Sequence, residues 1–433
     1  MLQVLIISAV ALLGLIALIF FKPSVIIRGR SFNIYWLAPL LGAALLVLLG
    51  SIGLDEVAVG LTDSSGMNPI KILVLLISMT VISIYLDNAG FFSYIAARML
   101  RVAGSSSTAL FFLLYAIVSF LTFFTSNDII VLTFTPFICY FARSAKIDPV
   151  PFLVCEFVAA NTWSMALIIG NPTNIYLASN AGIEFFEYLK TMIIPTLASA
   201  LVSLAIMWLV FRRKLSVPIT PQEGRAKLKN RFHVYAALVH LIVCIILMSV
   251  SLYIDIPMWL ISLCACLSLL SCSLLYSLIR SIKPMMIKNT LKRAPWDVVP
   301  FVISMFIIVL AFEKSGITEK LSAFLMRGNA VFTFGGASFL SANLINNIPM
   351  SVLFSSVCGG VAAQARPPAL YASIAGSNIG AFLTPIGAIA GIMWMSLLKI
   401  QRVEFGYTDF IKYGAIISVP TMIAALAALS III

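Results

Sequence analysis

The sequence carries little charge for its length. Asp, Glu, Lys and Arg make up 10% of the 433 residues, whereas 61% of the residues are hydrophobic and the mean hydropathy is +1.09. A soluble chain of this size needs more polar residues to cover its surface, so a soluble globular fold is excluded. Apolar runs of about 20 residues recur along the chain and are long enough to cross a bilayer as helices. We therefore expect an all-α polytopic membrane protein.

The sequence also lacks the motifs of several enzyme classes. It has no Walker A sequence, and its two histidines, His233 and His240, are seven residues apart, which matches no zinc motif. No nucleophile–base pair is evident. We therefore expect neither an enzyme nor a metal or cofactor site. The seven cysteines lie within or at the rim of apolar runs, without the pairing pattern of a disulfide framework.

The positive charge of the chain lies between the apolar runs. A net charge of +12 would otherwise suggest a nucleic-acid partner, but this placement is what membrane topology requires. If the basic linker at residues 212–231 is cytoplasmic, other basic loops share its side, namely those with Lys22, Arg28 and Arg30, Arg98 and Arg101, Arg143 and Lys146, Arg280 to Arg293, and Lys399 and Arg402. The opposite side receives Asp55, Glu56, Asp63, Glu184, Glu187 and Asp255. This predicts a multi-pass protein of the cell membrane with both termini outside the cytoplasm.

Two polar breaks divide long apolar segments into hairpins. Thr125-Ser126-Asn127-Asp128 lies within residues 107–143, and Asn346-Asn347-Ile348-Pro349 lies within residues 331–363. Polar groups amid such hydrophobicity are costly and are usually functional or satisfied by other protein groups. Charge counting does not separate a re-entrant hairpin from two full crossings. The polar tips favour re-entry.

Two further breaks interrupt predicted helices. Gly170-Asn171-Pro172-Thr173-Asn174 interrupts residues 149–188, and Thr384-Pro385-Ile386-Gly387 interrupts residues 367–399. Asn and Thr are good N-caps and Pro fits the first helical position, so both breaks are expected to be helix starts. Together with the hairpin tips they would bring four helix N-termini together, where free N–H groups favour an anionic or oxygen-rich solute.

The same landmarks recur in order on both sides of the linker. Leu86 to Gly90 parallels Phe312 to Gly316, and Asn127 parallels Asn347. The predicted topology inserts the two hairpins from opposite sides, so residues 1–211 and 232–433 are expected to be inverted repeats. Inverted repeats with broken helices are typical of secondary transporters. Asp87 and Glu313, at matching span ends, are expected at the membrane interface.

The candidate solute-binding residues are the polar side chains at these breaks: Ser126, Asn127, Asn171, Thr173, Asn174, Asn346, Asn347, Asn378 and Thr384. The alternative is that they only cap local breaks in the helices. Asp128 has no acidic counterpart, because Ile348 stands at the matching position. A carboxyl group in low dielectric exchanges a proton readily, so Asp128 is the first candidate for proton or cation coupling. Glu156 is either a second proton carrier or a residue at the cytoplasmic rim.

At these residues the sequence resembles the arsenical pump membrane protein family, of ArsB/NhaD type, within the ion transporter superfamily. The resemblance rests on Phe124 to Asp128, Thr135-Pro136, Ala294-Pro295-Trp296, Asn346 to Pro349 and Thr384 to Gly387. It implies a scaffold domain, a transport domain with two hairpins, elevator-type movement, and extrusion of arsenite or antimonite driven by proton entry. The break at Gly170 to Asn174 departs from the Ser-Asn-x-x-Asn type expected in arsenite pumps and is similar to anion permeases of the same superfamily.

We therefore expect a secondary active transporter that exports arsenite or antimonite in exchange for protons. The alternative is a sodium–proton antiporter or a sodium-coupled carrier of dicarboxylate-like anions. A passive channel and an intramembrane enzyme are further alternatives. The expected partners are the solute, H+ or Na+, and the lipid bilayer. A second copy of the chain and a separate soluble ATPase subunit are compatible with this interpretation, and a nucleic acid is not.

Overall fold

The chain forms a helical membrane protein. The computed structural model describes residues 1–21, 24–27, 30–62, 69–219, 230–251 and 253–433. Among these residues, eight helices are long and apolar enough to cross a membrane. The expected all-α polytopic class is thus confirmed. Several charged residues used for the predicted topology lie outside the described residues: Lys22, Arg28, Asp63, Arg225, Lys227 and Lys229, the last three in the linker.

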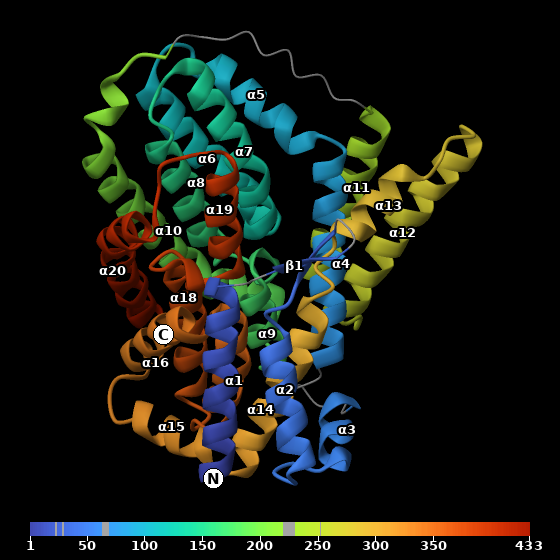
Figure 1. The fold of residues 1–433 in the computed structure, drawn as a ribbon, viewed down its shortest axis with the longest axis vertical. Helices are drawn as coiled ribbons and strands as arrows, with labels where there is room; N and C mark the ends of the chain where they lie inside the picture. The colour runs from blue at the N-terminus through green and yellow to red at the C-terminus, as the bar shows by residue number, and fades with distance from the viewer. Residues whose placement is uncertain (22–23, 28–29, 63–68, 220–229, 252) are drawn as a thin grey trace.

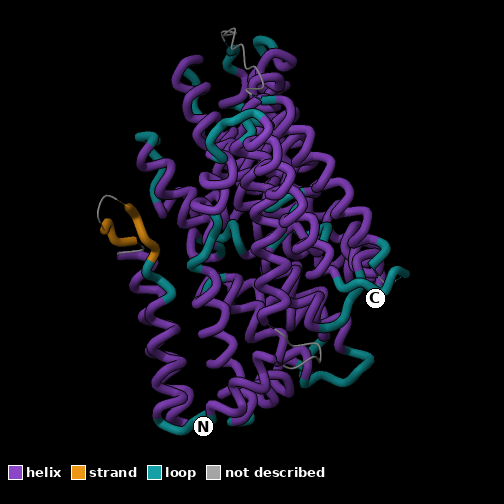
Figure 2. Tube along the Cα trace, turned by 90° about the vertical axis from the view of Figure 1, so that its right-hand side faces the viewer, coloured by secondary structure: helices purple, strands orange, loops and turns teal. Residues whose placement is uncertain are grey.

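The helices of the first half are bounded as follows. They are α1 (Leu2–Phe21), α2 (Leu37–Leu48), α3 (Leu54–Thr62), α4 (Pro69–Asn88), α5 (Phe91–Ala103), α6 (Ser107–Phe124), α7 (Asn127–Ala145), α8 (Val150–Trp163), α9 (Pro172–Asn180) and α10 (Phe185–Phe211), with the 3-10 turns η1 (Ile168–Gly170) and η2 (Lys214–Ser216). A short antiparallel hairpin, β1 (Ser24–Ile27) and β2 (Arg30–Asn33), joins α1 to α2 and was not expected from the sequence (Figure 2).

The second half follows a similar order. Its helices are α11 (Arg231–Ser249), α12 (Met258–Ile279), α13 (Met285–Arg293), α14 (Val298–Lys314), α15 (Ile317–Leu325), α16 (Ala330–Ile345), α17 (Asn347–Gly359), α18 (Arg366–Gly380), α19 (Ile389–Ile400) and α20 (Tyr407–Ile432), with the 3-10 turn η3 (Pro385–Gly387).

Several helices of both halves begin at side-chain caps. Before α6, Ser106 accepts a hydrogen bond from the amide of Ala109, and before α11, Asn230 accepts one from the amide of Phe232. Such caps satisfy amides that have no partner within the helix.

The helices pack in two sets. Helices α4, α11, α12 and α13 contact one another. Helix α14 contacts α4, and it also packs on α2 and on α17. The other set contains the two hairpins α6–α7 and α16–α17, the interrupted helices α8–α9 and α18–α19, and α10 and α20, which pack on each other. Figure 1 shows α4, α11, α12 and α13 standing beside the group of α6, α7, α8, α10, α19 and α20.

Two short helices, α5 and α15, here called arms, connect the first set of helices to the second. Helix α4 ends before Gly90, which has φ +86°, and α14 ends before Gly316, which has φ +68°. Positive φ is readily adopted by glycine, and here it turns the chain sharply into the next helix. The helices that follow, α5 and α15, lie at opposite ends of the molecule in Figure 1.

The second hairpin packs very closely on the interrupted helix α18. A Cβ atom at Gly376 would lie 1.9 Å from Ser338 Oγ and 2.4 Å from the carbonyl oxygen of Gly335. Only a residue without a side chain permits this approach between α16 and α18. The contact fixes the position of α18 along its own axis relative to α16, and so places Asn378 relative to the hairpin tip.

Candidate functional site

The first hairpin turns through two extended residues. Helix α6 ends at Phe124, Thr125 and Ser126 have φ of −132° and −93°, and α7 begins at Asn127. Asn127 is 1% exposed and donates from Nδ2 to Asn161 Oδ1 at 3.0 Å. Its Oδ1 atom is buried without a hydrogen-bond partner among the described residues. Since a buried unsatisfied oxygen is unfavourable, Asn127 Oδ1 is an acceptor that a solute or water can use.

The second hairpin turns at one strained residue. Asn346 has φ +73° and ψ 154°, a region that is essentially restricted to glycine and costs on the order of 1–3 kcal/mol for other residues. Its side chain compensates in part, because Oδ1 accepts from the amide of Ile348 and Nδ2 donates to the carbonyl of Ile386 at 2.8 Å. Asn347 is 4% exposed, and its side chain makes no hydrogen bond within the described part of the chain.

The break before α9 is a capped helix start. Asn171 Oδ1 accepts hydrogen bonds from the amide and the hydroxyl of Thr173, at 3.1 and 3.2 Å. Pro172 occupies the first helical position, where a missing N–H costs nothing. Asn174 donates back to the carbonyls of Ser164 and Leu167, so the chain between α8 and α9 is held in one shape.

Asn378 joins this break to the other half of the chain. Its Oδ1 accepts from Ser164 Oγ at 2.8 Å and from Asn171 Nδ2 at 3.0 Å. Its Nδ2 donates to Asn174 Oδ1 at 2.7 Å and to the carbonyl of Ile374. Ser377 adds a hydrogen bond to Thr173 Oγ1 at 3.0 Å. The Asn378 amide has therefore used its four hydrogen-bonding positions within the protein.

The second interrupted helix is organised around Asn343 of α16. Asn343 Oδ1 accepts from the amide and hydroxyl of Thr384, at 3.0 and 2.7 Å, while Nδ2 donates to the carbonyls of Phe339 and Gly380. The predicted helix start at Thr384-Pro385 is wrong, because these residues begin the turn η3 and α19 begins only at Ile389. The Thr384 amide bonds to another helix, and Ala388, the residue before α19, has no side chain that can cap it.

The tip of the first hairpin opens into a small cleft. Thr125 and Ser126 line it together with Pro172 of α9 and with Thr80 and Ser83 of α4, around a cavity of about 10 Å³, which has room for about one water molecule. The cleft lies between the two sets of helices. Its polar lining is made of hydroxyl groups, and no charged side chain is among its lining residues.

The two candidate coupling carboxyls have different surroundings. Asp128, in the first turn of α7, is partly exposed, and its carboxylate makes no hydrogen bond or ion pair with the described residues. Glu156 is 0% exposed, so it does not lie at a rim, and Thr135 donates to its carboxyl at 3.0 Å. No cation is paired with Glu156 in the described structure. Since an isolated buried charge is very costly, an ionised Glu156 would need a compensating partner.

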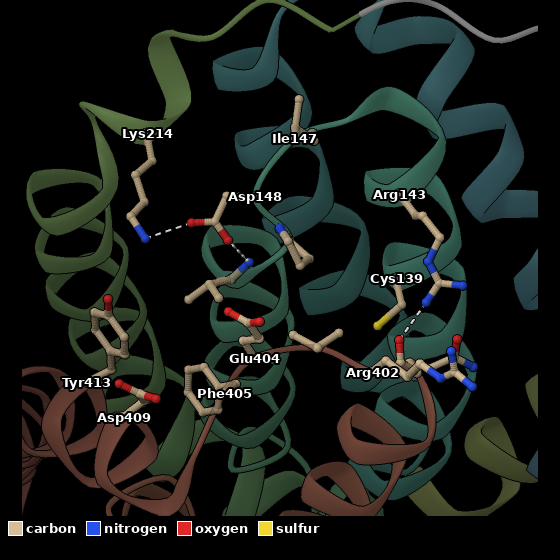
Figure 3. Close-up of a pocket in the computed structure, with 14 residues that line it drawn as sticks. Cys139, Arg143, Ile147, Asp148, Lys214, Arg402, Glu404, Phe405, Asp409 and Tyr413 are labelled. Carbon is tan, nitrogen blue, oxygen red and sulfur yellow. Dashed lines mark hydrogen bonds and ion pairs between the residues drawn. The ribbon is translucent and has the colours of Figure 1, made fainter.

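A wider pocket lies at the far end of α7, where several loops meet (Figure 3). Its volume is about 520 Å³, it is open to solvent, and it is lined by side chains of both signs. Lys214 bonds to Asp148 at 2.7 Å, and this hydrogen bond raises the pKa of Lys214 above its ordinary value. Arg143 donates to the carbonyl of Gln401. Because these charged groups already have partners and lie at the surface, the pocket is a weaker candidate for the solute site.

The structure therefore divides the predicted binding residues. Asn171, Thr173, Asn174 and Asn378 form one network, and Asn346 and Thr384 belong to a second one around η3. Ser126, Asn127 and Asn347 keep free hydrogen-bonding capacity within the described residues. Sequence reasoning missed Asn161, Ser164, Asn343 and Ser377, which complete the networks. Their signal was a polar side chain near the end of an apolar helix rather than within a break.

Comparisons with known proteins bear on the family and on the fold. The profile described as citrate transporter matches residues 1–376. The arsenical pump membrane proteins of Yersinia enterocolitica and Escherichia coli (strain K12) are each 25% identical, and the alignments cover 82% of this chain and 84% of theirs. The crystal structure of the Alcanivorax borkumensis YdaH transporter, described as having an unusual topology, superposes with a TM-score of 0.56 at 15% identity, over 99% of this chain and 97% of that one. The first two findings bear out the resemblance seen in the motifs, and the third supports the fold.

Proposed function

The chain belongs to the citrate transporter family, and from this premise we propose that it exports arsenite or antimonite in exchange for protons. That it is a membrane transporter and not an enzyme follows from the family. The named relatives are arsenical pumps, and this supports the solute class. The observation that carries the proposal is the unused hydrogen-bonding capacity of Asn127 Oδ1 and of the Asn347 side chain, at breaks that contain no cationic side chain.

The chemistry of the site favours a neutral solute. Undissociated arsenite is a trihydroxide that both donates and accepts hydrogen bonds. Amide and hydroxyl groups with unused capacity suit such a solute, and burying it needs no compensating charge. In this proposal Ser126, Asn127 and Asn347 contact the solute. Asn171, Thr173, Asn174, Asn346, Asn378 and Thr384 position the breaks around it.

We assign coupling to Asp128 first and to Glu156 second. Asp128 follows Asn127, whose Oδ1 has no partner among the described residues, and Asp128 is partly exposed, so it can exchange a proton with water. The set containing both hairpins would be the moving part, and the set of α4 and α11–α14 the static part. The two halves of the chain are in this proposal inverted repeats, with the basic loops on the cytoplasmic side.

A sodium-coupled carrier of a citrate-like anion is the second candidate. The family description favours it, and Asp128 with nearby backbone carbonyls offers oxygen ligands for a cation. A multiply charged anion needs compensating positive charge, which would come from bound sodium ions and helix N-termini.

Transport into everted membrane vesicles decides between the two. We expect an imposed inside-acid gradient to increase arsenite accumulation, a protonophore to abolish it, and a sodium gradient to have no effect. Asp55→Asn, at an exposed position in α3, is the matched control for Asp128→Asn. Accumulation that ignores the proton gradient would contradict proton coupling, and sodium-driven citrate uptake would establish the second candidate.

A further inference from the structure

Two carboxyl groups occupy matching places at the ends of the static helices. Asp87 lies in the last turn of α4 and Glu313 in the last turn of α14, each three residues before the glycine that begins an arm. Neither belongs to the solute site described above. Their positions were expected to be interfacial, a role that requires no partner on another helix.

Each carboxyl instead accepts a hydrogen bond from the returning arm of a hairpin. The Thr133 hydroxyl of α7 lies 2.9 Å from Asp87 Oδ1 and 2.8 Å from the Ile129 carbonyl, and it shares its single proton between these two acceptors. Ser356 of α17 donates to Glu313 Oε1. Hydrogen bonds to an ionised acceptor are the stronger kind, and these two join the two sets of helices directly.

We propose that Asp87 and Glu313 are positioning residues that hold α7 and α17 to the static helices, and so set how readily the hairpins move. This inference rests on the proposed function, because it takes the hairpins as the moving part. In an inverted repeat, equivalent contacts at the two ends exchange roles as the site changes sides. Both contacts are present together here, so the two hairpins are held at once.

The two carboxyl groups differ in the number of other groups that bond to them. Asp87 is also bound by Arg293 Nη2 at 2.7 Å, and its side chain is 11% exposed. Glu313 has no ion-pair partner within the described residues, and its neighbour Lys314 bonds to Glu56 at 2.8 Å. Loss of the Thr133 hydroxyl therefore leaves Asp87 satisfied, whereas loss of the Ser356 hydroxyl removes the hydrogen-bond donor of Glu313.

The distance between the two sets of helices measures the proposed effect. Spin labels on cysteines at Tyr253, between α11 and α12, and Lys190, on α10, sit at exposed positions of the static and moving parts. Double electron–electron resonance in lipid, in a background without the seven native cysteines, gives the distance distribution. We expect Ser356→Ala to raise the ratio of the minor to the major distance by about fivefold, and Thr133→Val by about twofold, because one hydrogen bond is lost in each.

Matched controls separate positioning from general stability. Ser199→Ala and Thr196→Val remove buried hydroxyls that bond only within α10, and they should leave the distances unchanged. If Ser356→Ala and Thr133→Val lower thermal stability but leave the distribution unchanged, the proposal is overturned. The measurement needs no solute. A changed distribution without arsenite transport therefore rejects the solute and keeps the positioning role.

Discussion

The two hairpin tips differ in backbone and in charge. The first turns through extended residues in ordinary conformations and presents Asp128 one residue after its asparagine. The second turns at Asn346, with φ +73°, and presents Ile348 at the same place. A strained residue persists only where its surroundings hold it, and here the bond to the Ile386 carbonyl does so. On this comparison we propose that ionic coupling lies at the first tip, and that the second tip is the more rigid of the two solute contacts.

The two interrupted helices also differ, in this case in the partners to which their breaks are bonded. The first break is capped by its own Asn171 and is bonded to α18 of the other half through Asn378. The second is bonded to its own hairpin through Asn343. The network around Asn378 therefore holds the two halves together, whereas Asn343 shapes only one of them.

The largest expected effect is a loss of transport when Asp128, at the tip of the first hairpin, is replaced. Asp128→Asn keeps the shape of the side chain but removes the exchangeable proton. We expect proton-driven transport to fall by about a hundredfold or more, a hundredfold being the low end of what a positioned acid or base contributes. Solute-dependent thermal stabilisation should persist, because Asn127 and Asn347 remain. Full transport activity in this variant would place coupling elsewhere, with Glu156 next to be tested.

The next largest effect is a loss of stability when the close contact between α16 and α18 is disturbed. Gly376→Ala would force a Cβ into Ser338 and the Gly335 carbonyl, and we expect a loss of about 3 kcal/mol or more in the free energy of unfolding. Gly336→Ala, on the same helix as Gly335, meets nothing within 4 Å and should be neutral or stabilising by up to about 1 kcal/mol. Equal stability of the two variants, measured by denaturation in detergent, would show that α16 and α18 are not this close.

The two central asparagines should differ in the number of partners lost. Asn378→Ala removes the hydrogen-bond partner of Asn171 Nδ2 and of Asn174 Oδ1 among the described residues, and should cost about 2–3 kcal/mol. Asn161→Ala loses its bonds to Asn127 and to the Phe157 carbonyl and should cost about 1 kcal/mol. If Asn161 proves the more costly of the two, the halves are not held together at Asn378.

The smallest effect concerns the strained turn. Asn346→Gly loses a cap but relieves the backbone, so its stability should stay within about 1 kcal/mol of the native chain. Asn346→Ala loses the cap and keeps the strain, and it should be less stable than the glycine variant by about 1 kcal/mol or more. Thermal unfolding of the pair checks the order. The opposite order would mean that φ at residue 346 is not positive.

The membrane class and the positions of the breaks follow from the sequence for simple reasons. Apolar runs separated by basic loops leave few alternatives to a helical membrane protein. Polar residues such as Asn171-Pro172 are unmistakable within an apolar run because Pro and Asn fit a helix start. The hairpin β1–β2 was missed because its segment contains Lys22, Arg28 and Arg30 and was therefore interpreted as a short basic loop.

Which side chains meet was not predictable in the same way. Thr384-Pro385 has the composition of a helix start, yet the Thr384 amide is used by Asn343, so the helix begins four residues later. Asn378 was chosen only as one more polar residue. Its role in joining the halves depends on the height of α18, which the Gly376 contact sets. Such choices are made by tertiary packing, which local patterns do not encode.

The central claim is that both hairpin tips contact one solute. Thermal unfolding in lipid nanodiscs tests it directly, with native cysteines replaced because arsenite binds thiols. We predict that arsenite or antimonite raises the melting temperature of the parent protein, and that Asn127→Ala and Asn347→Ala each abolish this rise, while Ser199→Ala keeps it. A rise that survives in either asparagine variant would contradict a site shared by the two tips.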